Sequence, residues 1–279
     1  MTDRYAVIGN PVHHSKSPWI HAAFAAQTGQ DLSYEAVLGE LDGFEGQVLA
    51  MARGGVRGLN VTLPFKERAL ALADRVSDRA RLAGAANTLL FAAGGVSADN
   101  TDGIGLMRDL QQRLHVQLAG RRLLVIGAGG AVRGILGPLI AAAPAGIDLH
   151  NRTLERARGL AEAFSGVAGA VTLAALGAGH LARAEPYDLV INGTSASLAG
   201  ELPQIPSSVF RPGAVAYDLA YRLDGPTPFL TQAQAAGAGV VADGLGMLVE
   251  QAAEAFLLWR GVRPETAPVL QALRCRAAG

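Results

Sequence analysis

Short apolar runs alternate with segments of helical periodicity along the first part of the chain. In chain order, strands and helices are predicted in turn at residues 5–8, 18–27, 32–38, 44–52, 58–63 and 65–72. Strands that alternate with helices form βαβ units around a largely parallel sheet. The first hundred residues are therefore predicted to form an α/β domain.

A second alternation of strand and helix begins at residue 122. Strands are predicted in the strings LLVIGAGG, IDLHNRT, YDLVINGT and AVAYDLA, with helices from residue 131 and over 154–164. This order is typical of a doubly wound parallel sheet. An amphipathic helix is predicted over 245–258 and a closing helix over 264–274. Joints between domains are expected in the Gly- and Asp-containing segments 102–105 and 243–246.

Length and charge narrow the class of protein. The chain has 279 residues, which corresponds to about two domains of roughly 150 residues. Lys and Arg (24) balance Asp and Glu (24), so no bulk field would steer the protein onto nucleic acid or an anionic membrane. The longest uncharged stretch, 134–147, is interrupted by glycine and proline and is too short to span a bilayer. Small-molecule partners are expected, and a homodimer is left open.

The number of cysteines bears on the cellular compartment in which the protein is expected. Cys275 is the single cysteine, which excludes an intramolecular disulfide and any multi-cysteine metal site. The first residues, MTDRYAVIG, carry charges and too short an apolar run for an export signal. A cytoplasmic location is therefore expected.

A glycine-rich turn follows the first strand of the second series. Gly127, Ala128, Gly129, Gly130 and Ala131 separate that strand from the helix it opens. Backbone N–H groups in this context can approach a pyrophosphate. The next position of the usual dinucleotide pattern is Val132, so a plain strand-to-helix turn is the alternative.

The end of the next strand indicates which dinucleotide binds. An NAD site would present Asp or Glu there for the ribose 2′-hydroxyl, whereas this chain has His150, Asn151, Arg152 and Thr153. The planar guanidinium of Arg152 suits a 2′-phosphate, which it can hold by two parallel hydrogen bonds. NADP is therefore favoured, and an ordinary surface arginine is the alternative.

Two charged residues stand at predicted helix starts. Lys66 lies in an opening turn, where the helix macrodipole disfavours a cation and so favours proton exchange with a substrate hydroxyl. Asp102 directly precedes a helix that runs toward Leu114. A solvated lysine and an ordinary N-cap aspartate are the alternatives. At a joint between domains, the Asp102 carboxylate is well placed to fix a substrate hydroxyl.

The start of the first helix is rich in hydroxyls. Pro18 suits the first helical position and Ser17 the N-cap, which leaves the Ser15 hydroxyl without a structural purpose. Two hydroxyls at a helix start form a candidate carboxylate site. The neighbouring His13 and His14 lack acidic or cysteine partners at ligand spacing, so no metal is expected. Gln251, on the apolar stripe of its helix, is either an internally bonded amide or a ligand contact.

From end to end the chain resembles the NADP-dependent shikimate dehydrogenase family. The strings that carry the resemblance occur in the family's order and spacing: YAVIGNPVHHSKSPWIH, LNVTLPFKE, LAGAANTL, DNTDGIGL, VIGAGGAVRG, HNRT, VINGTSAS, ADGLGMLVEQAA and AFLLWRGV. The family's glycine loop, GAGGA followed by a variable residue, accommodates Val132. The resemblance implies two lobes, an N-terminal α/β substrate domain (1–103, completed by C-terminal helices in 245–279) and a Rossmann-type NADP-binding domain (104–244).

The resemblance also implies roles for individual residues. It assigns Lys66 and Asp102 as the catalytic pair. Around shikimate it places Ser15, Ser17, Asn60, Thr62, Asn87, Asp102, Tyr221 and Gln251. Around NADP it places Asp78, Gly127, Ala128, Gly129, Gly130, Ala131, Asn151, Arg152, Thr153, Thr194, Leu219, Gly244 and Met247.

The implied activity is the reversible NADPH-dependent reduction of 3-dehydroshikimate to shikimate, on the pathway to chorismate and aromatic amino acids. Lys66 is expected to transfer the proton while Asp102 orients the reacting hydroxyl. One alternative is a quinate/shikimate dehydrogenase that uses NAD, which Arg152 argues against. Another is a ligand sensor without turnover, which the presence of both Lys66 and Asp102 argues against.

Overall fold

The computed structural model describes residues 2–194, 196 and 201–276, which form two compact units. The first unit runs to Gly105 and also contains Leu248–Leu273. The second contains Leu106–Met247 and the chain from Arg274. Each unit is built on a six-stranded sheet, so the predicted α/β class with two sheets is confirmed.

The first unit follows the predicted alternation and adds elements to it. Its elements are β1 (Asp3–Gly9), α1 (Ser17–Thr28), β2 (Leu32–Leu38), α2 (Phe44–Arg53), β3 (Val56–Val61), α3 (Lys66–Ala71), β4 (Arg75–Val76), α4 (Asp78–Ala83), β5 (Thr88–Ala92) and β6 (Gly95–Asp99). The strand order is β2-β1-β3-β5-β6-β4, parallel among β1, β2 and β3 and antiparallel around β5. The sequence prediction did not include β4, α4, β5 or β6, because elements of two to six residues are too short to show a recognisable period.

Strand alternation divides the core of this unit between the two faces of the sheet. Ala6 and Ile8 of β1 belong to a cluster that includes Phe44 of α2 and Phe65, whose rings stack at 4.5 Å. Tyr5, on the other face, stacks on Trp259 at 4.7 Å. Successive side chains of a strand point to opposite faces, so β1 is buried on both.

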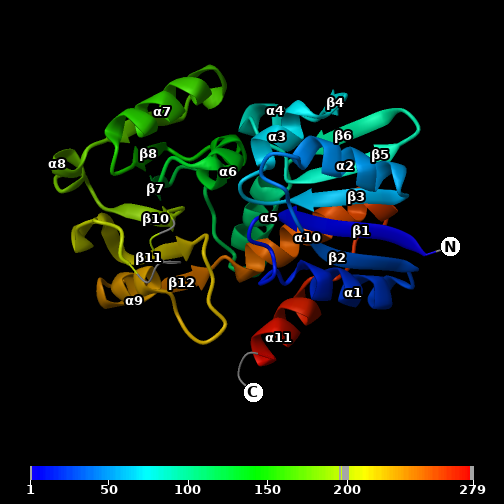
Figure 1. Cartoon of the computed structure of the whole chain (residues 1–279). Coiled ribbons are helices and arrows are strands. Elements are labelled where there is room, and N and C mark those ends of the chain that lie inside the picture. The colour runs from blue at the N-terminus through cyan, green and yellow to red at the C-terminus, as the bar shows by residue number, and fades with distance from the viewer. Residues whose placement is uncertain (1, 195, 197–200, 277–279) are drawn as a thin grey trace. The chain divides into compact units, whose positions relative to one another are not determined.

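The C-terminal helices α10 (Leu245–Arg260) and α11 (Ala267–Cys275) contribute to this unit. Figure 1 shows the orange α10 beside the blue strands β1 and β2, although most of the chain separates them in sequence. The indole N–H of Trp259 donates to the carbonyl of Leu89 at 3.0 Å. Gly58 faces the same indole, and a Cβ there would overlap it. A residue without a side chain at 58 therefore lets α10 reach the sheet.

Helix α1 begins one residue earlier than the sequence indicated. Ser17 is its first residue, Lys16 occupies the N-cap position, and no side chain caps the helix. The prediction of Ser17 as the N-cap is therefore wrong. Instead, the Ser15 hydroxyl accepts a hydrogen bond from the Ser17 N–H at 3.2 Å. The residue expected to be spare thus supports the turn that leads into α1.

His21 of α1 is a buried titratable group in the aromatic core of this unit. Its side chain is fully buried and stacks on Tyr34 at 4.1 Å, and neither ring nitrogen has a hydrogen-bond partner among the described residues. Burial lowers the pKa of His21 from 6.5 to about 3, a shift that the nearby Asn60 amide only partly offsets. The folded protein therefore holds this ring neutral where an unfolded chain would protonate it.

We expect His21 to make the protein sensitive to acid. Because the folded pKa lies below the unfolded one, its contribution to stability is complete above pH 6.5 and is lost as the pH falls toward about 3. This single group should lower the free energy of unfolding by about 1.4 kcal/mol per pH unit in that window. Denaturant unfolding of wild type and His21→Phe between pH 5 and 7 measures the difference in slope. Substitution of the exposed His14 by Phe serves as the control and should leave the wild-type slope unchanged. A His21→Phe variant that kept the wild-type slope would contradict the prediction.

The second unit is the expected doubly wound sheet. Its strands are β7 (Arg122–Ile126), β8 (Gly146–His150), β9 (Thr172–Leu176), β10 (Tyr187–Asn192), β11 (Phe210–Asp218) and β12 (Val240–Asp243). Its helices are α6 (Gly130–Ala141), α7 (Leu154–Ala168), α8 (Ala178–Leu181), the short 3₁₀ segment η3 (Ser207–Val209) and α9 (Pro228–Ala235). The order β12-β11-β10-β7-β8-β9 is parallel throughout. Strands β8 and β9 are added on one side of β7, and β10, β11 and β12 on the other, so the order of strand addition reverses between β7 and β10. In such sheets ligands bind at the carboxyl ends of the strands beside that reversal.

The helix predicted from Asp102 toward Leu114 is divided. The α-helix α5 spans Asp102–Arg108, and a π-helical segment, η1, spans Asp109–Arg113. The Asp109 carboxylate is buried and receives hydrogen bonds from Arg113 at 2.5 and 2.9 Å and from the Tyr217 hydroxyl at 2.7 Å. Burial, followed by the Asp109 charge, raises the pKa of Tyr217 well above its usual value. This cluster anchors the π-helical turn to β11.

Candidate active site

One edge of the first sheet collects polar side chains from several elements. In the strand register, Asn60 of β3 pairs with Thr88 of β5, which pairs in turn with Asp99 of β6. Since β5 runs antiparallel to its neighbours, the carboxyl ends of β3 and β6 meet the start of β5 at this edge. Lys66 and Asp102 follow β3 and β6, and Asn87 directly precedes β5, so all three lie at this edge.

Lys66 and Asp102 form a short ion pair. Lys66 is the first residue of α3, and its Nζ lies 2.6 Å from Asp102 Oδ2. Their side chains are 20% and 10% exposed, so the pair is sheltered yet open to a small molecule. Helix α3 has only six residues, and the charge that contacts Lys66 Nζ is the Asp102 carboxylate.

Asp102 does not cap the helix it begins. Its Oδ1 accepts from Asn87 Nδ2 at 2.8 Å and its Oδ2 pairs with Lys66. The side chain that supports the helix start is Asn100, whose Oδ1 accepts the Asp102 N–H at 3.1 Å. The N-cap alternative for Asp102 is therefore wrong, and its carboxylate is directed toward the lysine and the amide.

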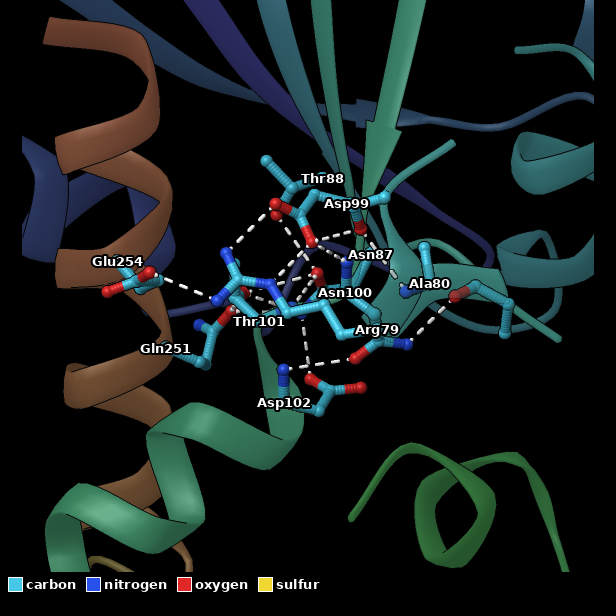
Figure 2. A network of polar contacts seen from close by, with 12 residues as sticks. Arg79, Ala80, Asn87, Thr88, Asp99, Asn100, Thr101, Asp102, Gln251 and Glu254 are labelled. Atoms are coloured by element: carbon cyan, nitrogen blue, oxygen red, sulfur yellow. Dashed lines mark hydrogen bonds and ion pairs between the residues drawn. The ribbon is translucent and has the colours of Figure 1, made fainter. Parts of the chain in front are cut away.

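Asn87 connects the pair to α10 (Figure 2). Its Nδ2 also lies 2.9 Å from Thr101 Oγ1 and 3.3 Å from Gln251 Oε1, and its Oδ1 accepts the Thr101 N–H at 2.8 Å. Gln251 donates its own Nε2–H to the Leu248 carbonyl at 2.9 Å. Gln251 is thus an internally bonded amide that also belongs to the cluster. Sequence reasoning missed Thr101, although it stands inside the string DNTDGIGL.

Asn60 supports this cluster from beneath. Its Oδ1 accepts the Tyr34 hydroxyl at 2.7 Å, and its Nδ2 donates to the Asn87 carbonyl at 3.3 Å and to Thr88 Oγ1 at 3.2 Å. Both amide hydrogens are used within the protein, so Asn60 holds its neighbours and has no spare donor. Tyr34 is another residue that the sequence did not indicate. Desolvation of its hydroxyl raises the pKa of Tyr34 well above the usual value despite the nearby Ser17 hydroxyl.

The hydroxyl loop and Thr62 lie in the same unit. Ser17 is buried, whereas Ser15 and Thr62 are half-buried. Thr62 donates its N–H to the Ile8 carbonyl at 2.9 Å, and its methyl group would overlap a Cβ at Gly9. Glycine at position 9 therefore allows the loop after β3 to pack against the end of β1.

In the second unit, the predicted nucleotide residues follow one row of the sheet. The row comprises His150, Ile126, Asn192, Asp218 and Asp243 of β8, β7, β10, β11 and β12, which are paired in register. The residues that follow them start the loops at the carboxyl edge. Gly127, Asn151, Thr194, Leu219 and Gly244 consequently all belong to one edge of one sheet.

The glycine loop suits a phosphate group. Gly127 has a φ of +110°, a backbone conformation that side chains disfavour. Helix α6 has twelve residues, no side-chain cap and no acidic residue in its first turn. Gly129, Gly130 and Ala131 are exposed, and a Cβ at either glycine would meet nothing within 4 Å. The uncapped amides of α6 therefore face open space with a partial positive charge that an anion can neutralise.

The loop after β8 presents Arg152 to solvent. Arg152 and Thr153 are exposed, and Asn151 Nδ2 donates to the Thr153 carbonyl at 2.8 Å. Thr153 occupies the N-cap position of α7 without a side-chain cap bond. Because β8 is next to β7 in the sheet, this loop neighbours the glycine loop.

The remaining predicted residues of this unit make separate contacts. Thr194 bonds to Asn192 Oδ1 through both its N–H and its hydroxyl, at 3.1 and 2.7 Å. Gly244 packs so closely on the Leu219 carbonyl that a Cβ would overlap it. Met247 is buried in the first turn of α10. Tyr221 belongs to this unit too, and burial, followed by the Asp243 charge, raises its pKa.

Asp78 is separate from the other predicted cofactor residues. It belongs to the first unit, where it is exposed in the first turn of α4. A carboxylate is favoured there by the helix amides, which accounts for the residue without a ligand. Among the described residues, no group of three or more His, Cys, Asp or Glu side chains could hold a metal ion. No helix in that part of the chain is both long and apolar enough to cross a membrane.

Comparisons with known proteins cover nearly the whole chain. Residues 7–89 match the family described as shikimate dehydrogenase substrate binding domain, residues 109–199 match shikimate / quinate 5-dehydrogenase, and residues 244–274 match shikimate 5'-dehydrogenase C-terminal domain. A shikimate dehydrogenase (NADP(+)) from Alkalilimnicola ehrlichii is 57% identical over 98% of this chain and 99% of its own.

Solved structures show the same similarity. An Ael1 enzyme from Pseudomonas putida has a TM-score of 0.90 at 48% identity, covering 98% of each chain. Shikimate 5-dehydrogenase from Thermus thermophilus, in complex with NADP(H) and shikimate, has a TM-score of 0.86 at 36% identity, covering 99% of this chain and 100% of its own.

Proposed function

The chain belongs to the shikimate dehydrogenase family, and we propose that Lys66 and Asp102 perform the proton transfer of its reaction. The protein is an NADP-dependent oxidoreductase that reduces 3-dehydroshikimate to shikimate reversibly, as the sequence resemblance implied. The observation that carries the proposal is the 2.6 Å contact of Lys66 Nζ with Asp102 Oδ2, next to the amides of Asn87 and Gln251.

In the reducing direction Lys66 donates a proton from Nζ to the ketone oxygen, which becomes the C3 hydroxyl. In the oxidising direction it takes the proton of the C3 hydroxyl. Asp102 accepts a hydrogen bond from that hydroxyl and keeps it beside Nζ, a geometry suited to general acid–base catalysis. Asn87 holds the other Asp102 oxygen and thereby fixes the plane of the carboxylate.

The second unit fits NADP. Open amides at the start of α6 would bind the pyrophosphate, with Gly127, Ala128, Gly129, Gly130 and Ala131 forming the loop. Asn151, Arg152 and Thr153 would hold the adenosine ribose phosphate, and Thr194, Leu219, Gly244 and Met247 would face the nicotinamide. When bound, NADP supplies the hydride acceptor or donor.

The remaining assignments are proposals of the same kind. The substrate domain is 1–103 with 245–279, and the cofactor domain is 104–244. Tyr221 is proposed as a substrate residue and Asp78 as a cofactor residue. The single cysteine supports a cytoplasmic location. A homodimer without nucleic-acid partners is compatible with the zero net charge.

One absorbance assay tests the activity. Shikimate or quinate is combined with NADP or NAD in all four pairings, and nicotinamide reduction is followed. Shikimate with NADP should give by far the fastest rate. A preference for quinate or for NAD would favour the quinate/shikimate alternative, and no turnover in any pairing would favour a sensor.

Single substitutions of Ser17 and Ser15 should distinguish a role in substrate binding from a role in supporting the start of α1. Ser17→Ala should raise KM for shikimate about tenfold, the effect of losing a hydrogen bond of about 1.5 kcal/mol to the charged carboxylate. Its melting temperature should fall less than that of Ser15→Ala, because the Ser17 side chain does not support the start of α1. Ser15→Ala should raise KM and also lower stability by about 0.5–2 kcal/mol, because its hydroxyl accepts the Ser17 N–H.

Steady-state kinetics and thermal melts of both variants measure these effects, with KM for NADP as the internal control. A Ser15→Ala, Ser17→Ala double variant that melted earlier yet bound shikimate as tightly as wild type would remove this loop from the site.

A further inference from the structure

We propose that Arg79 is a positioning residue for the substrate site, because it joins the turn that carries Asp102 to the helix that carries Gln251. Arg79 was not among the residues singled out from the sequence. The inference rests on the proposed function, since it takes Asp102, Asn87 and Gln251 as substrate-binding residues. It adds a residue that touches none of the reacting groups.

The Arg79 guanidinium bridges two buried carboxylates (Figure 2). Its Nε and Nη2 donate to the two oxygens of Asp99 at 2.6 and 2.9 Å, and its Nη1 donates to Glu254 Oε1 at 3.2 Å. The side chains of Asp99 and Glu254 are only 11% and 9% exposed. Two buried carboxylates that face one cation repel each other when the cation is removed.

Asp99 transmits the position of Arg79 to the catalytic aspartate. Its Oδ1 accepts the Asn100 N–H at 2.7 Å, and its backbone carbonyl accepts the Asn87 N–H at 3.0 Å. Asn100 in turn accepts the Asp102 N–H at 3.1 Å. A shift of the Asp99 carboxylate would therefore move Asn100 and with it Asp102, and a shift of the Asp99 backbone would move Asn87.

Glu254 transmits the same constraint to α10. Gln251 lies three residues before Glu254, which places both side chains on one face of the helix. Figure 2 shows the two residues on the same helix, directed toward the turn at Asp99–Asp102. The planar fork of arginine fixes three hydrogen-bond directions at once, which a lysine ammonium cannot do. Arg79 thus sets the spacing between Gln251 and the Asn87–Asp102 contact.

Arg263 offers a matched control. It also pairs with α10, through Glu254 at 3.1 Å and Glu250 at 2.6 Å, and its side chain is 26% exposed against 30% for Arg79. Arg263 thus resembles Arg79 in charge, burial and helix partner. Asp99 is not among the contacts described for it, so its loss should weaken α10 without releasing the turn that carries Asp102.

The experiment measures shikimate binding to the full chain by calorimetry, together with kcat, KM and the melting temperature. Arg79→Met should weaken the Kd for shikimate at least about tenfold and lower kcat by about 10- to 100-fold, as expected when groups in the site are displaced by about an ångström. Arg263→Met should melt earlier by a similar amount and keep the Kd for shikimate within about twofold. The Kd for NADP should be unchanged in both, because the proposed nucleotide residues of the second unit are intact.

Other outcomes would overturn the proposal. If Arg79→Met melts as early as Arg263→Met but binds shikimate like wild type, Arg79 only stabilises the fold. If Arg79→Met does not fold, Arg79→Lys replaces it. The lysine variant should show an intermediate loss of shikimate binding, and wild-type binding would refute the inference.

Asp102→Asn, measured alongside, separates this inference from the proposed function. Weaker shikimate binding in Asp102→Asn together with unchanged binding in the Arg79 variants would overturn the role of Arg79 alone. Unchanged binding in Asp102→Asn would remove the substrate site assignment and the inference with it.

Discussion

Lys66→Ala should lower kcat by about 10²- to 10⁴-fold, the usual contribution of a general acid–base group, while KM for shikimate changes much less. The expectation rests on the position of Nζ, 2.6 Å from the carboxylate proposed to hold the reacting hydroxyl. Alanine removes the only group in this pair that can donate a proton to a ketone oxygen. Steady-state rates in both directions measure the loss.

Lys66→Arg distinguishes proton transfer from simple charge. Arginine keeps a cation beside Asp102 but does not release its proton near neutral pH. If Lys66 transfers the proton, the arginine variant should be nearly as slow as the alanine variant. A kcat above about a tenth of wild type in Lys66→Ala, or recovery in Lys66→Arg, would rule out the proton-transfer role.

Arg152→Ala should weaken NADP binding by about 1.5–3 kcal/mol, or about 10- to 150-fold, with little effect on NAD. Arg152 is exposed at the end of β8, next to the strand that carries the glycine loop. Its fork can bind a 2′-phosphate that NAD lacks. KM values for both cofactors give the result as a change in selectivity.

Arg158 supplies a control for that experiment, because it is an exposed arginine of α7 farther from the loop. Arg158→Ala should leave the preference for NADP close to that of wild type. Equal losses for NADP and NAD in Arg152→Ala would mean that Arg152 supports the fold or the adenine and does not recognise the phosphate.

The sequence was most informative where an apolar pattern extends over many residues, or where a motif stands between a recognisable strand and a recognisable helix. The strand at 32–38, the glycine loop and the arginine after the next strand could all be located before the structure was known. The second sheet could be predicted because buried parallel strands are continuous apolar runs. Elements such as β4 and β6 escaped because strands of two and five residues are too short to show a period.

The contacts of the site were harder to predict for a physical reason. Whether Asp102 caps a helix or faces Lys66 depends on where Asn100 directs its side chain, and both outcomes are compatible with the string DNTDG. The sequence resemblance predicts Asn60 near the substrate, but it gives no sign that the Asn60 amide oxygen accepts the hydroxyl of Tyr34, which lies 26 positions away. Hydrogen-bond partners that are distant in sequence leave no local pattern to detect.

The return of α10 and α11 to the first unit has a consequence for biosynthesis. Residues 248–273 emerge from the ribosome only after the whole stretch Leu106–Met247. The sheet of the first unit therefore waits for Trp259, whose indole bonds to a strand 170 positions earlier. Such distant closures are slow and leave an apolar face uncovered in the nascent chain. Gln251 arrives on the same helix, so the unit that holds shikimate gains this residue only after the whole stretch Leu106–Met247 has been synthesised.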